Sequence, residues 1–383
     1  MAGFKFQSPR ALIAEPGVAA RIGEVLEPLG VNSVLLVSDR GVKNAGLLEA
    51  PMAHLRTSGI AVECFFDVEA DPSAATVQAA AQLARSSGVD CVVAIGGGSP
   101  MDVAKLAALL AKSGVDLEDI YGIHKTEGPR LRLVLVPTTA GTGSEATPIS
   151  IVTTGAGEKK GVVCPVLLPD IAVLDAELTI GLPKHVSAAT GIDAMVHAIE
   201  AYTSRSLKNP LSDCLAREAL RLLGPHLERV CAQGHDVETR QAMLLGANLA
   251  GMAFANAPVA AVHALAYPIG ARFHVPHGLS NSLMLPAVLR FNMTSAESLY
   301  AELASLLVPN AIGSPEELTR ALLAYLTELP VKLGLPVRLR DVGITAEDLP
   351  DLAIDAMKQS RLLVNNPREV GYDDALAMYQ EVF

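Results

Sequence analysis

The sequence predicts two domains of different class: an α/β domain built on a mostly parallel sheet over residues 1–184, followed by an all-α domain over residues 185–383. Three observations predict this division. The chain has 383 residues, which is more than one hydrophobic core usually supports. Short apolar runs alternate with helical patterns in the first half, as in parallel sheets covered by helices on both faces. Beyond about Pro183 only long helical patterns remain.

Four strands are expected in the first domain, because four short apolar runs are each bounded by polar or turn-forming residues. These runs lie at residues 33–38, 60–66, 90–95 and 132–136. Helical patterns separate them at residues 46–58, 73–87 and 100–112. This order is typical of a Rossmann-like sheet, whose ligands bind beyond the carboxyl ends of the strands.

The second domain is expected to be helical throughout. Its helical patterns lie at residues 186–204, 210–233, 238–257 and 296–307. The run 242–271 is apolar enough to raise the question of a membrane span, but it is rich in alanine and glycine and contains Asn248, Pro258 and His263. A buried helix that breaks near Pro258 is the better interpretation, and we expect no membrane segment.

Composition excludes some functional classes. Half of the residues are hydrophobic and only 4% are aromatic, so the core is expected to be aliphatic. The net charge is -11, and no block of lysine and arginine is long enough to follow a phosphate backbone, so nucleic-acid binding is not expected. The odd number of scattered cysteines predicts free thiols in a reducing cytoplasm. These are Cys64, Cys91, Cys164, Cys214 and Cys231.

One carboxylate and three imidazoles form a candidate metal site. Asp193 and His197 are four residues apart in a proline-free helical stretch, so they lie on one face of the expected helix. His263 lies in an apolar helical run, and His277 is expected in a loop. A mixed shell of oxygen and nitrogen suits zinc or ferrous iron better than calcium or magnesium.

Chance is the alternative explanation for such a set, because an isolated histidine is more often a core or surface residue than a ligand. That interpretation is kept for His54, His124, His185, His226 and His235. Two glycine-rich segments, each after an expected strand, favour the metal-site interpretation for the four candidate ligands over a chance arrangement.

The first glycine-rich segment is GGGSPMD at residues 96–102. Glycine lets a backbone approach a ligand closely, Ser99 is expected to cap the following helix, and Pro100 suits a first helical position. The exposed amide groups of such a helix start attract a pyrophosphate. The alternative is an ordinary turn between strand and helix.

The second segment, PTTAGTGSE at residues 137–145, also follows an expected strand. Its hydroxyl groups and glycines predict a polar cradle for phosphate, ribose or amide groups, and the alternative is a solvated loop. Neither segment has the G-x-G-x-x-G fingerprint, so the site differs in detail from an ordinary Rossmann site.

Asp39, at the end of the first expected strand, is placed to accept hydrogen bonds from an adenosine ribose. A carboxylate would repel a 2′-phosphate, which favours NAD over NADP. Arg40 beside it weakens the inference, because an arginine tolerates that phosphate.

Six motifs in order along the chain resemble those of the iron-containing (group III) alcohol dehydrogenases. They are GGGSPMDVAK (96–105), PTTAGTGSE (137–145), LPD (168–170), GIDAMVHAIEAY (191–202), HALAYPIG (263–270) and PHGLSN (276–281). The resemblance implies a dehydroquinate synthase-like architecture, with a dinucleotide-binding domain and a helical metal-binding domain. It also implies hydride transfer between NAD(H) and a small aliphatic primary alcohol, diol or aldehyde.

The resemblance also carries functional positions onto this sequence. Asp193, His197, His263 and His277 correspond to the metal ligands, with Fe²⁺ as the expected ion and Zn²⁺ as the alternative. The expected dinucleotide-binding positions are Asp39, Asp71, Gly97, Gly98, Ser99, Asp102, Thr138, Thr139, Thr142, Lys160, Leu178, Thr179 and Leu182. A homodimer or higher homo-oligomer is expected.

Two positions depart from the family pattern. Asp71 stands where many members have asparagine. Tyr267, which we include among the catalytic candidates, stands where many have a histidine that is a candidate for passing protons to solvent. A phenol titrates near ~10 and an imidazole near ~6.5, so a tyrosine relays a hydrogen bond but accepts protons poorly near neutrality.

Two alternative functions remain. A zinc-dependent polyol dehydrogenase of the glycerol type has the same architecture, but the TTAGTGSE, HALAYPIG and PHGLSN segments favour the alcohol dehydrogenase branch. A noncatalytic nucleotide-binding protein is disfavoured by the complete ligand set.

Overall fold

The computed structural model describes residues 3–155 and 158–383. The chain divides into two compact units. The sheet unit comprises Gln7–Gly181 and His235–Leu244, and the helical unit comprises Met1–Phe6, Leu182–Gly234 and Leu245–Phe383. The N-terminal segment therefore groups with the helical unit, and His235–Leu244 groups with the sheet unit, although each is remote in sequence from the rest of its unit. Such a grouping depends on tertiary contacts, which a local sequence pattern does not reveal.

A six-stranded parallel sheet forms the centre of the sheet unit, with strand order β1-β9-β6-β4-β2-β3. Its strands are β1 (Ala11–Ala14), β2 (Ser33–Val37), β3 (Ala61–Phe65), β4 (Cys91–Gly96), β6 (Arg132–Pro137) and β9 (Ile171–Leu174). The four predicted strands are confirmed as β2, β3, β4 and β6. The short strands β1 and β9 were not predicted.

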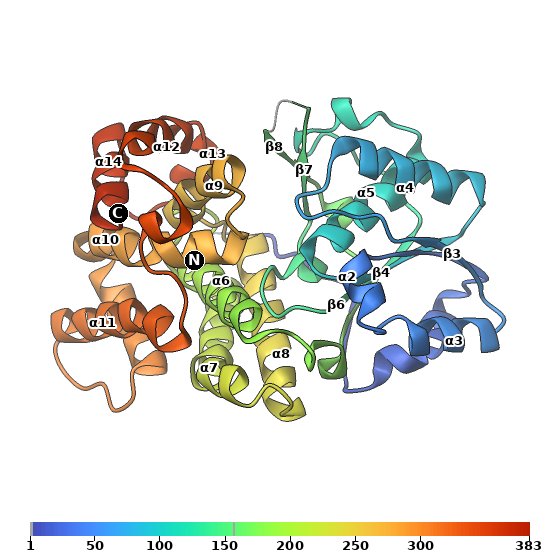
Figure 1. Ribbon diagram of the computed structural model, residues 1–383, viewed down its shortest axis with the longest axis horizontal. Helices are drawn as coiled ribbons and strands as arrows, with labels where there is room; N and C mark the ends of the chain where they lie inside the picture. Colours follow the sequence, from blue (N-terminus) through green and yellow to red (C-terminus); the bar gives the residue numbers. More distant parts are fainter. Residues whose placement is uncertain (1–2, 156–157) are drawn as a thin grey trace. The chain divides into compact units, whose positions relative to one another are not determined.

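Alternate side chains of each strand point to opposite faces of this sheet, and apolar side chains on both faces pack against helices. On β4, Val92 and Ala94 pack with α4 and α5, whereas Val93 and Ile95 pack with α1, α2 and α3 on the other face (Figure 1). The helices are α1 (Ile22–Leu26), α2 (Arg40–Asn44), α3 (Glu49–Thr57), α4 (Ala74–Ser86) and α5 (Gly98–Ser113).

A three-stranded sheet, also not predicted, has the order β5-β8-β7. Its strands are β5 (Gly122–Ile123), β7 (Ile149–Thr153) and β8 (Lys159–Val163). Strand β7 runs antiparallel to β8 and packs against α5. Strand β7 begins shortly after the PTTAGTGSE loop, whereas β5 precedes that loop in the sequence.

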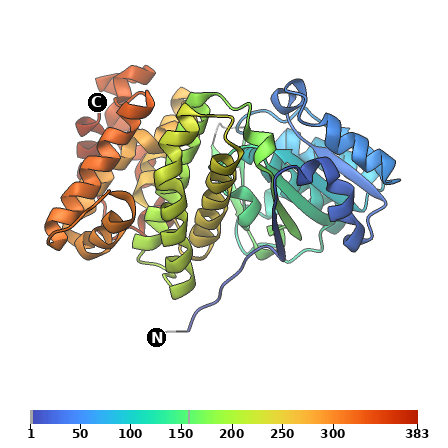
Figure 2. The same ribbon diagram turned by 90° about the horizontal axis from the view of Figure 1, so that it is seen from below.

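The helical unit confirms the all-α prediction. Its helices are α6 (Lys184–Thr203), α7 (Pro210–Ala232), α8 (Val237–Asn256), whose first turns belong to the sheet unit, α9 (Ala261–Phe273), α10 (His277–Leu307), α11 (Pro315–Leu333), α12 (Leu349–Met357), α13 (Ser360–Leu363) and α14 (Tyr372–Glu381). Helix α6 packs against α7 and α10, and α10 packs against α11. Figure 2 shows these long helices side by side within the unit.

The predicted break near Pro258 is confirmed, since α8 ends at Asn256 and α9 begins at Ala261 with a bend of 107° between them. Across the described residues, no single helix combines the length and hydropathy needed to cross a membrane. The bent pair of α8 and α9 reaches that length and hydropathy only when the two helices are counted together.

The topology places a ligand site at the carboxyl ends of β2 and β4. The chain leaves β2 through α2 and α3 on one face of the sheet, and it leaves the neighbouring β4 through α5 on the other face. Two adjacent strands whose connections diverge in this way open a crevice where α/β proteins bind ligands. The hydroxyl of Ser38 donates to the carbonyl of Ile95 at 2.6 Å, which ties the two strand ends together.

Candidate functional site

Four side chains of the helical unit converge on one point. Asp193 and His197 come from α6, His263 from α9 and His277 from α10, and one potential ligand atom from each lies within 4.8 Å of the others. The Oδ1 atom of Asp193 lies 4.0, 3.9 and 3.6 Å from the Nε2 atoms of His197, His263 and His277. The helical spacing predicted for Asp193 and His197 is confirmed.

The prediction that His277 lies in a loop was wrong. His277 is the first residue of α10, and Pro276 is its N-cap residue. Proline and glycine around a histidine suggest a loop, but proline is also common where a helix begins. The helix start holds this imidazole on a rigid element.

Electrostatics favour the ionised form of Asp193, which is almost fully buried. Burial raises the pKa of this carboxyl. The imidazoles of His197, His277 and His263 and a hydrogen bond from Asn281 outweigh burial and bring the pKa below its ordinary value. The side-chain nitrogen of Asn281 donates to Asp193 Oδ1 at 2.6 Å. The cluster therefore presents an anionic oxygen among imidazole nitrogens.

The spacing of these atoms fits a first-row divalent ion. Two atoms that bind one such ion at about 2.1 Å each lie at most about 4.2 Å apart. The three oxygen-to-nitrogen distances lie between 3.6 and 4.0 Å and therefore fall within that limit. The donor set of one carboxylate and three imidazoles suits Fe²⁺ or Zn²⁺.

The sequence reasoning missed two side chains that contact this cluster. Glu200 faces His263, with 2.6 Å between Oε2 and Nδ1, and Asn281 contacts Asp193. Helical spacing could have indicated both: Glu200 is three residues after His197 on α6, and Asn281 is four residues after His277 on α10.

Aromatic rings surround the cluster. The ring of Phe254 stacks on His197 with centroids 4.4 Å apart, and Tyr267 lies 5.8 Å from His277 and 6.4 Å from His263. Tyr267 is one turn after His263 on α9, which places its ring beside two of the four ligand candidates. Its catalytic role stays a prediction.

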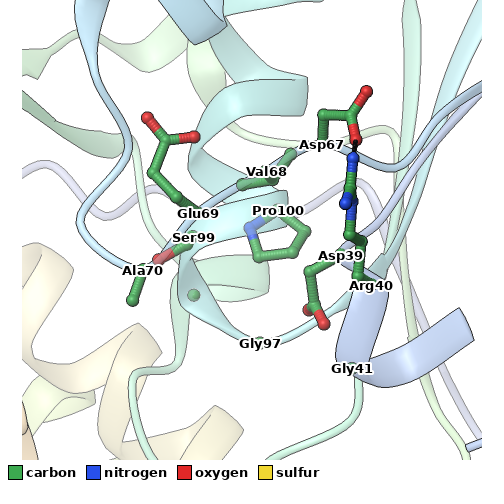
Figure 3. A pocket seen from close by; sticks show the side chains of 11 residues that line it. Asp39, Arg40, Gly41, Asp67, Val68, Glu69, Ala70, Gly97, Ser99 and Pro100 are labelled. Atoms are coloured by element: carbon green, nitrogen blue, oxygen red, sulfur yellow. Dashed lines mark hydrogen bonds and ion pairs between the residues drawn. The ribbon is translucent and has the colours of Figure 1, made fainter. Parts of the chain in front are cut away.

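The sheet unit contains a pocket of ≈ 570 Å³ at the crevice between β2 and β4. Figure 3 shows the residues that line it: Asp39, Arg40, Gly41, Asp67, Val68, Glu69, Ala70, Gly97, Gly98, Ser99 and Pro100. They follow the carboxyl ends of β2, β3 and β4. Four of the residues predicted to bind the dinucleotide, Asp39, Gly97, Gly98 and Ser99, therefore share this pocket.

Negative charge dominates the pocket wall. Asp39 caps α2 by accepting a hydrogen bond from the backbone of Val42 at 2.9 Å, and it points away from Arg40 (Figure 3). Arg40 is paired with Asp67 at 2.7 Å. Burial raises the pKa of Glu69, but hydrogen bonds to its carboxylate lower the pKa by more, so that the pKa lies below its ordinary value. The largest of these contributions comes from the hydroxyl of Thr76. Glu69 is therefore ionised at neutral pH.

The glycine loop adjoins the PTTAGTGSE loop. A Cβ atom on Gly98 would lie 3.0 Å from Thr142 Cγ2, so only glycine allows this approach without a shift of the threonine. The backbone N–H of Thr138 donates to the carbonyl of Gly96 at 2.9 Å. The prediction that Ser99 caps the helix was wrong, because the N-cap is Gly97 and Ser99 lies inside the first turn. Pro100 is the third residue of the helix and not the first as predicted, but it still lies in the first turn, where helix N–H groups have no intrahelical partner.

An ion pair within α5, between Asp102 and the fully buried Lys105, is hydrogen-bonded to the second loop and to β7. Asp102 Oδ1 accepts from the Ser144 hydroxyl at 2.7 Å, and its Oδ2 accepts from the backbone of Ile151 at 2.8 Å. The Lys105 ammonium lies 3.6 Å from Asp102 and donates to the Ser144 hydroxyl at 2.7 Å and to the carbonyl of Ile149 at 2.6 Å. Asp102, predicted to bind the dinucleotide, therefore has both carboxylate oxygens engaged within the protein.

The remaining predicted positions lie apart from the lining of this pocket. Asp71 has a left-handed backbone (φ 54°), which asparagine adopts readily, and pairs with Lys159 at 2.7 Å. Lys160 lies over the ring of Tyr121, at 5.3 Å from its centroid. Leu178 is buried in the sheet unit's core, the hydroxyl of Thr179 donates to Ala176, and Leu182 belongs to the helical unit. The PTTAGTGSE loop holds the last three positions, Thr138, Thr139 and Thr142. Their contact with a dinucleotide stays a prediction.

Comparisons with known proteins cover both units. Residues 9–176 match the family model for iron-containing alcohol dehydrogenase, and residues 187–383 match its C-terminal domain model. A long-chain-alcohol dehydrogenase of Geobacillus thermodenitrificans is 38% identical over 93% of this chain and 90% of its own length. Among solved structures, a 1,3-propanediol oxidoreductase is 34% identical, with full coverage of both chains and a TM-score of 0.96. Sulfoacetaldehyde reductase from Bifidobacterium kashiwanohense, solved with NAD⁺, is 28% identical, with coverage of 100% and 99% and a TM-score of 0.90. The chain belongs to the iron-containing alcohol dehydrogenase family.

Proposed function

We propose that this protein is a metal-dependent alcohol dehydrogenase that transfers hydride between NAD(H) and a small aliphatic primary alcohol, diol or aldehyde. The observation that carries the proposal is the convergence of Asp193, His197, His263 and His277, whose ligand atoms lie within 4.8 Å of one another. The relatives support the reaction class, since they include a long-chain-alcohol dehydrogenase and a 1,3-propanediol oxidoreductase.

Asp193 and the three histidines would hold the metal ion. When bound, the ion supplies Lewis acidity that polarises the carbonyl oxygen of the aldehyde. The Asp193 carboxylate offsets part of the ion's charge, and Phe254 shields one face of His197 from water. Tyr267, beside His277, is placed to donate a hydrogen bond to a group at this site.

We propose Fe²⁺ as the resident ion, because the family to which the chain belongs is iron-containing. Zn²⁺ is its competitor, because the donor set suits both ions and zinc generally binds such sites more tightly. Purification without air, followed by elemental analysis, identifies the ion. Activity that is restored to the metal-depleted protein by Fe²⁺ but not by Zn²⁺ supports the assignment, and the reverse result overturns it.

The charges around the pocket support NAD over NADP. Three carboxylates, of Asp39, Asp67 and Glu69, line it, and its one arginine, Arg40, is paired with Asp67. A 2′-phosphate carries negative charge that these carboxylates repel. The ribose hydroxyls of NAD instead are suitable donors to Asp39.

Replacing Asp39 with asparagine tests this preference. Asparagine caps a helix as well as aspartate does, so α2 is expected to remain intact while one negative charge is lost. We expect the ratio of kcat/KM with NADP to kcat/KM with NAD to rise about tenfold, which corresponds to the loss of one close like-charge repulsion. Asp116→Asn, an exposed change in the same unit but outside the pocket, is the matched control. An unchanged ratio for Asp39→Asn would exclude Asp39 as the selectivity determinant.

An assay of NADH formation with a panel of alcohols tests the function itself. Turnover with aliphatic primary alcohols or diols supports the proposal. Turnover confined to glycerol and other polyols with zinc bound would instead support the polyol dehydrogenase. Nucleotide binding without turnover of any alcohol or aldehyde in the metal-loaded protein would overturn the proposal in favour of a noncatalytic nucleotide-binding protein.

A further inference from the structure

Glu200 is a buried carboxylate beside the metal-ligand cluster. It lies on α6, the helix that also carries Asp193 and His197, and only 4% of it is exposed. Its two oxygens face two different groups of α9. Oε2 lies 2.6 Å from Nδ1 of His263, and Oε1 accepts from the backbone N–H of Val262 at 2.7 Å.

The contact with His263 determines which nitrogen of that ring carries the proton. A carboxylate only accepts hydrogen bonds, so Nδ1 must be the protonated nitrogen for the 2.6 Å contact to be favourable. The lone pair is then on Nε2, the atom that lies 3.9 Å from Asp193 Oδ1 within the cluster. Glu200 thus turns the coordinating nitrogen of His263 toward the other three ligand candidates.

We propose that Glu200 is a positioning residue that fixes the tautomer and ring orientation of His263 and thereby sets the affinity of the site for its divalent ion. The inference rests on the proposed function, because it requires His263 to be a ligand. Carboxylates that accept from ligating histidines tune metal affinity in this way in other metalloproteins.

The bond to Val262 adds a second role for the same carboxylate. Val262 lies in the first turn of α9, where backbone N–H groups lack helical partners. By accepting from this N–H, Glu200 fixes the start of α9 against α6. His263, the next residue, is therefore held in orientation through both its backbone and its ring.

Glutamine at position 200 separates this role from simple packing, because it matches glutamate in size and shape. Glutamate accepts from both Val262 and His263, whereas an amide has one accepting oxygen and one donating nitrogen. If the amide nitrogen faces His263, the ring proton moves to Nε2 and the coordinating lone pair is lost. If it faces Val262, two donors oppose each other at the start of α9.

The test measures Zn²⁺ affinity of the full-length metal-free protein by competition with a chromophoric chelator. We expect Glu200→Gln to bind Zn²⁺ about 10- to 100-fold more weakly than the wild type. Glu297→Gln makes the same chemical change at an exposed site on α10 and is expected to leave affinity unchanged. A folded Glu200→Gln protein with wild-type affinity would overturn the proposal. A wild type that binds no divalent ion would overturn the proposed function instead.

A second measurement needs no change at Glu200. In the zinc-loaded wild type, ¹⁵N NMR of labelled histidine rings is expected to show the His263 proton on Nδ1, with the resonance assigned by its loss in His263→Ala. A proton on Nε2 would contradict the proposal.

Discussion

Replacing His197 with alanine is expected to remove the bound divalent ion and to lower kcat/KM for alcohol oxidation by about 1,000-fold or more. His197 supplies one of four ligand candidates in a buried cluster, and alanine leaves a hole lined by Phe254 and His263 that offers no replacement donor. Metal content by elemental analysis and steady-state kinetics with NAD measure the two effects.

The matched control lies on the same helix. His185, in the first turn of α6, is exposed, so His185→Ala is expected to retain both metal and activity. The affinity of His197→Ala for NAD, measured by fluorescence titration, is expected to stay close to that of the wild type. The pocket at β2 and β4 is formed by other residues. A metal-free His197→Ala protein with full turnover would rule out the metal-dependent reaction.

The large elements of the fold were predictable because their sequence patterns are local. The buried strands β2, β4 and β6 are largely continuous apolar runs, and α6, α7 and α8 are long helical patterns, of which α7 continues through Pro225. Strand β1 has the sequence ALIA, which is apolar, but it is only four residues long, so a run of this length does not by itself indicate a strand. Its strand conformation is stabilised by pairing with β9, at a sequence separation too large for a local pattern to indicate.

The same reasoning applies to the candidate sites. Asp193 and His197 have a local signature, since four-residue spacing on a helix places them on one face. The importance of Glu200 depends on Val262 and His263, which belong to another helix. Its role could therefore be inferred only once α6 and α9 were seen in contact. Capping positions were equally hard to predict, because the choice between Gly97 and Ser99 depends on backbone geometry at the end of β4.

Lys105 gives the second large expected effect, on stability. Its ammonium group is fully buried and lies 3.6 Å from Asp102, so Lys105→Met leaves that carboxylate without its counterion. Removing one partner of a buried ion pair costs about 3–5 kcal/mol. We expect the free energy of unfolding, measured by urea denaturation, to fall by this amount. Lys112→Met, on an exposed position of the same helix, is the control and is expected to have little effect.

The pH dependence distinguishes the lost counterion from lost packing. Burial raises the pKa of Asp102, and the charge of Lys105 opposes that rise. Without Lys105 the folded-state pKa rises further above the unfolded value of about 3.9. A group with a raised folded pKa contributes stability that is present below the unfolded pKa and lost as pH rises through the folded pKa. The deficit of Lys105→Met relative to the wild type should therefore be smallest near pH ~4 and grow toward neutrality.

The double variant Asp102→Asn/Lys105→Met completes this test. Asparagine carries no charge, so the deficit of the double variant relative to the wild type should be smaller than that of Lys105→Met at neutral pH. It should also lack the growth toward neutrality that the unpaired carboxylate of Lys105→Met causes. The amide oxygen introduced at position 102 can still accept one hydrogen bond, from Ser144 or Ile151, which keeps the PTTAGTGSE loop attached to α5. A deficit in Lys105→Met that is the same at every pH would mean that Lys105 stabilises the fold through its packing and hydrogen bonds and not through the charge of Asp102.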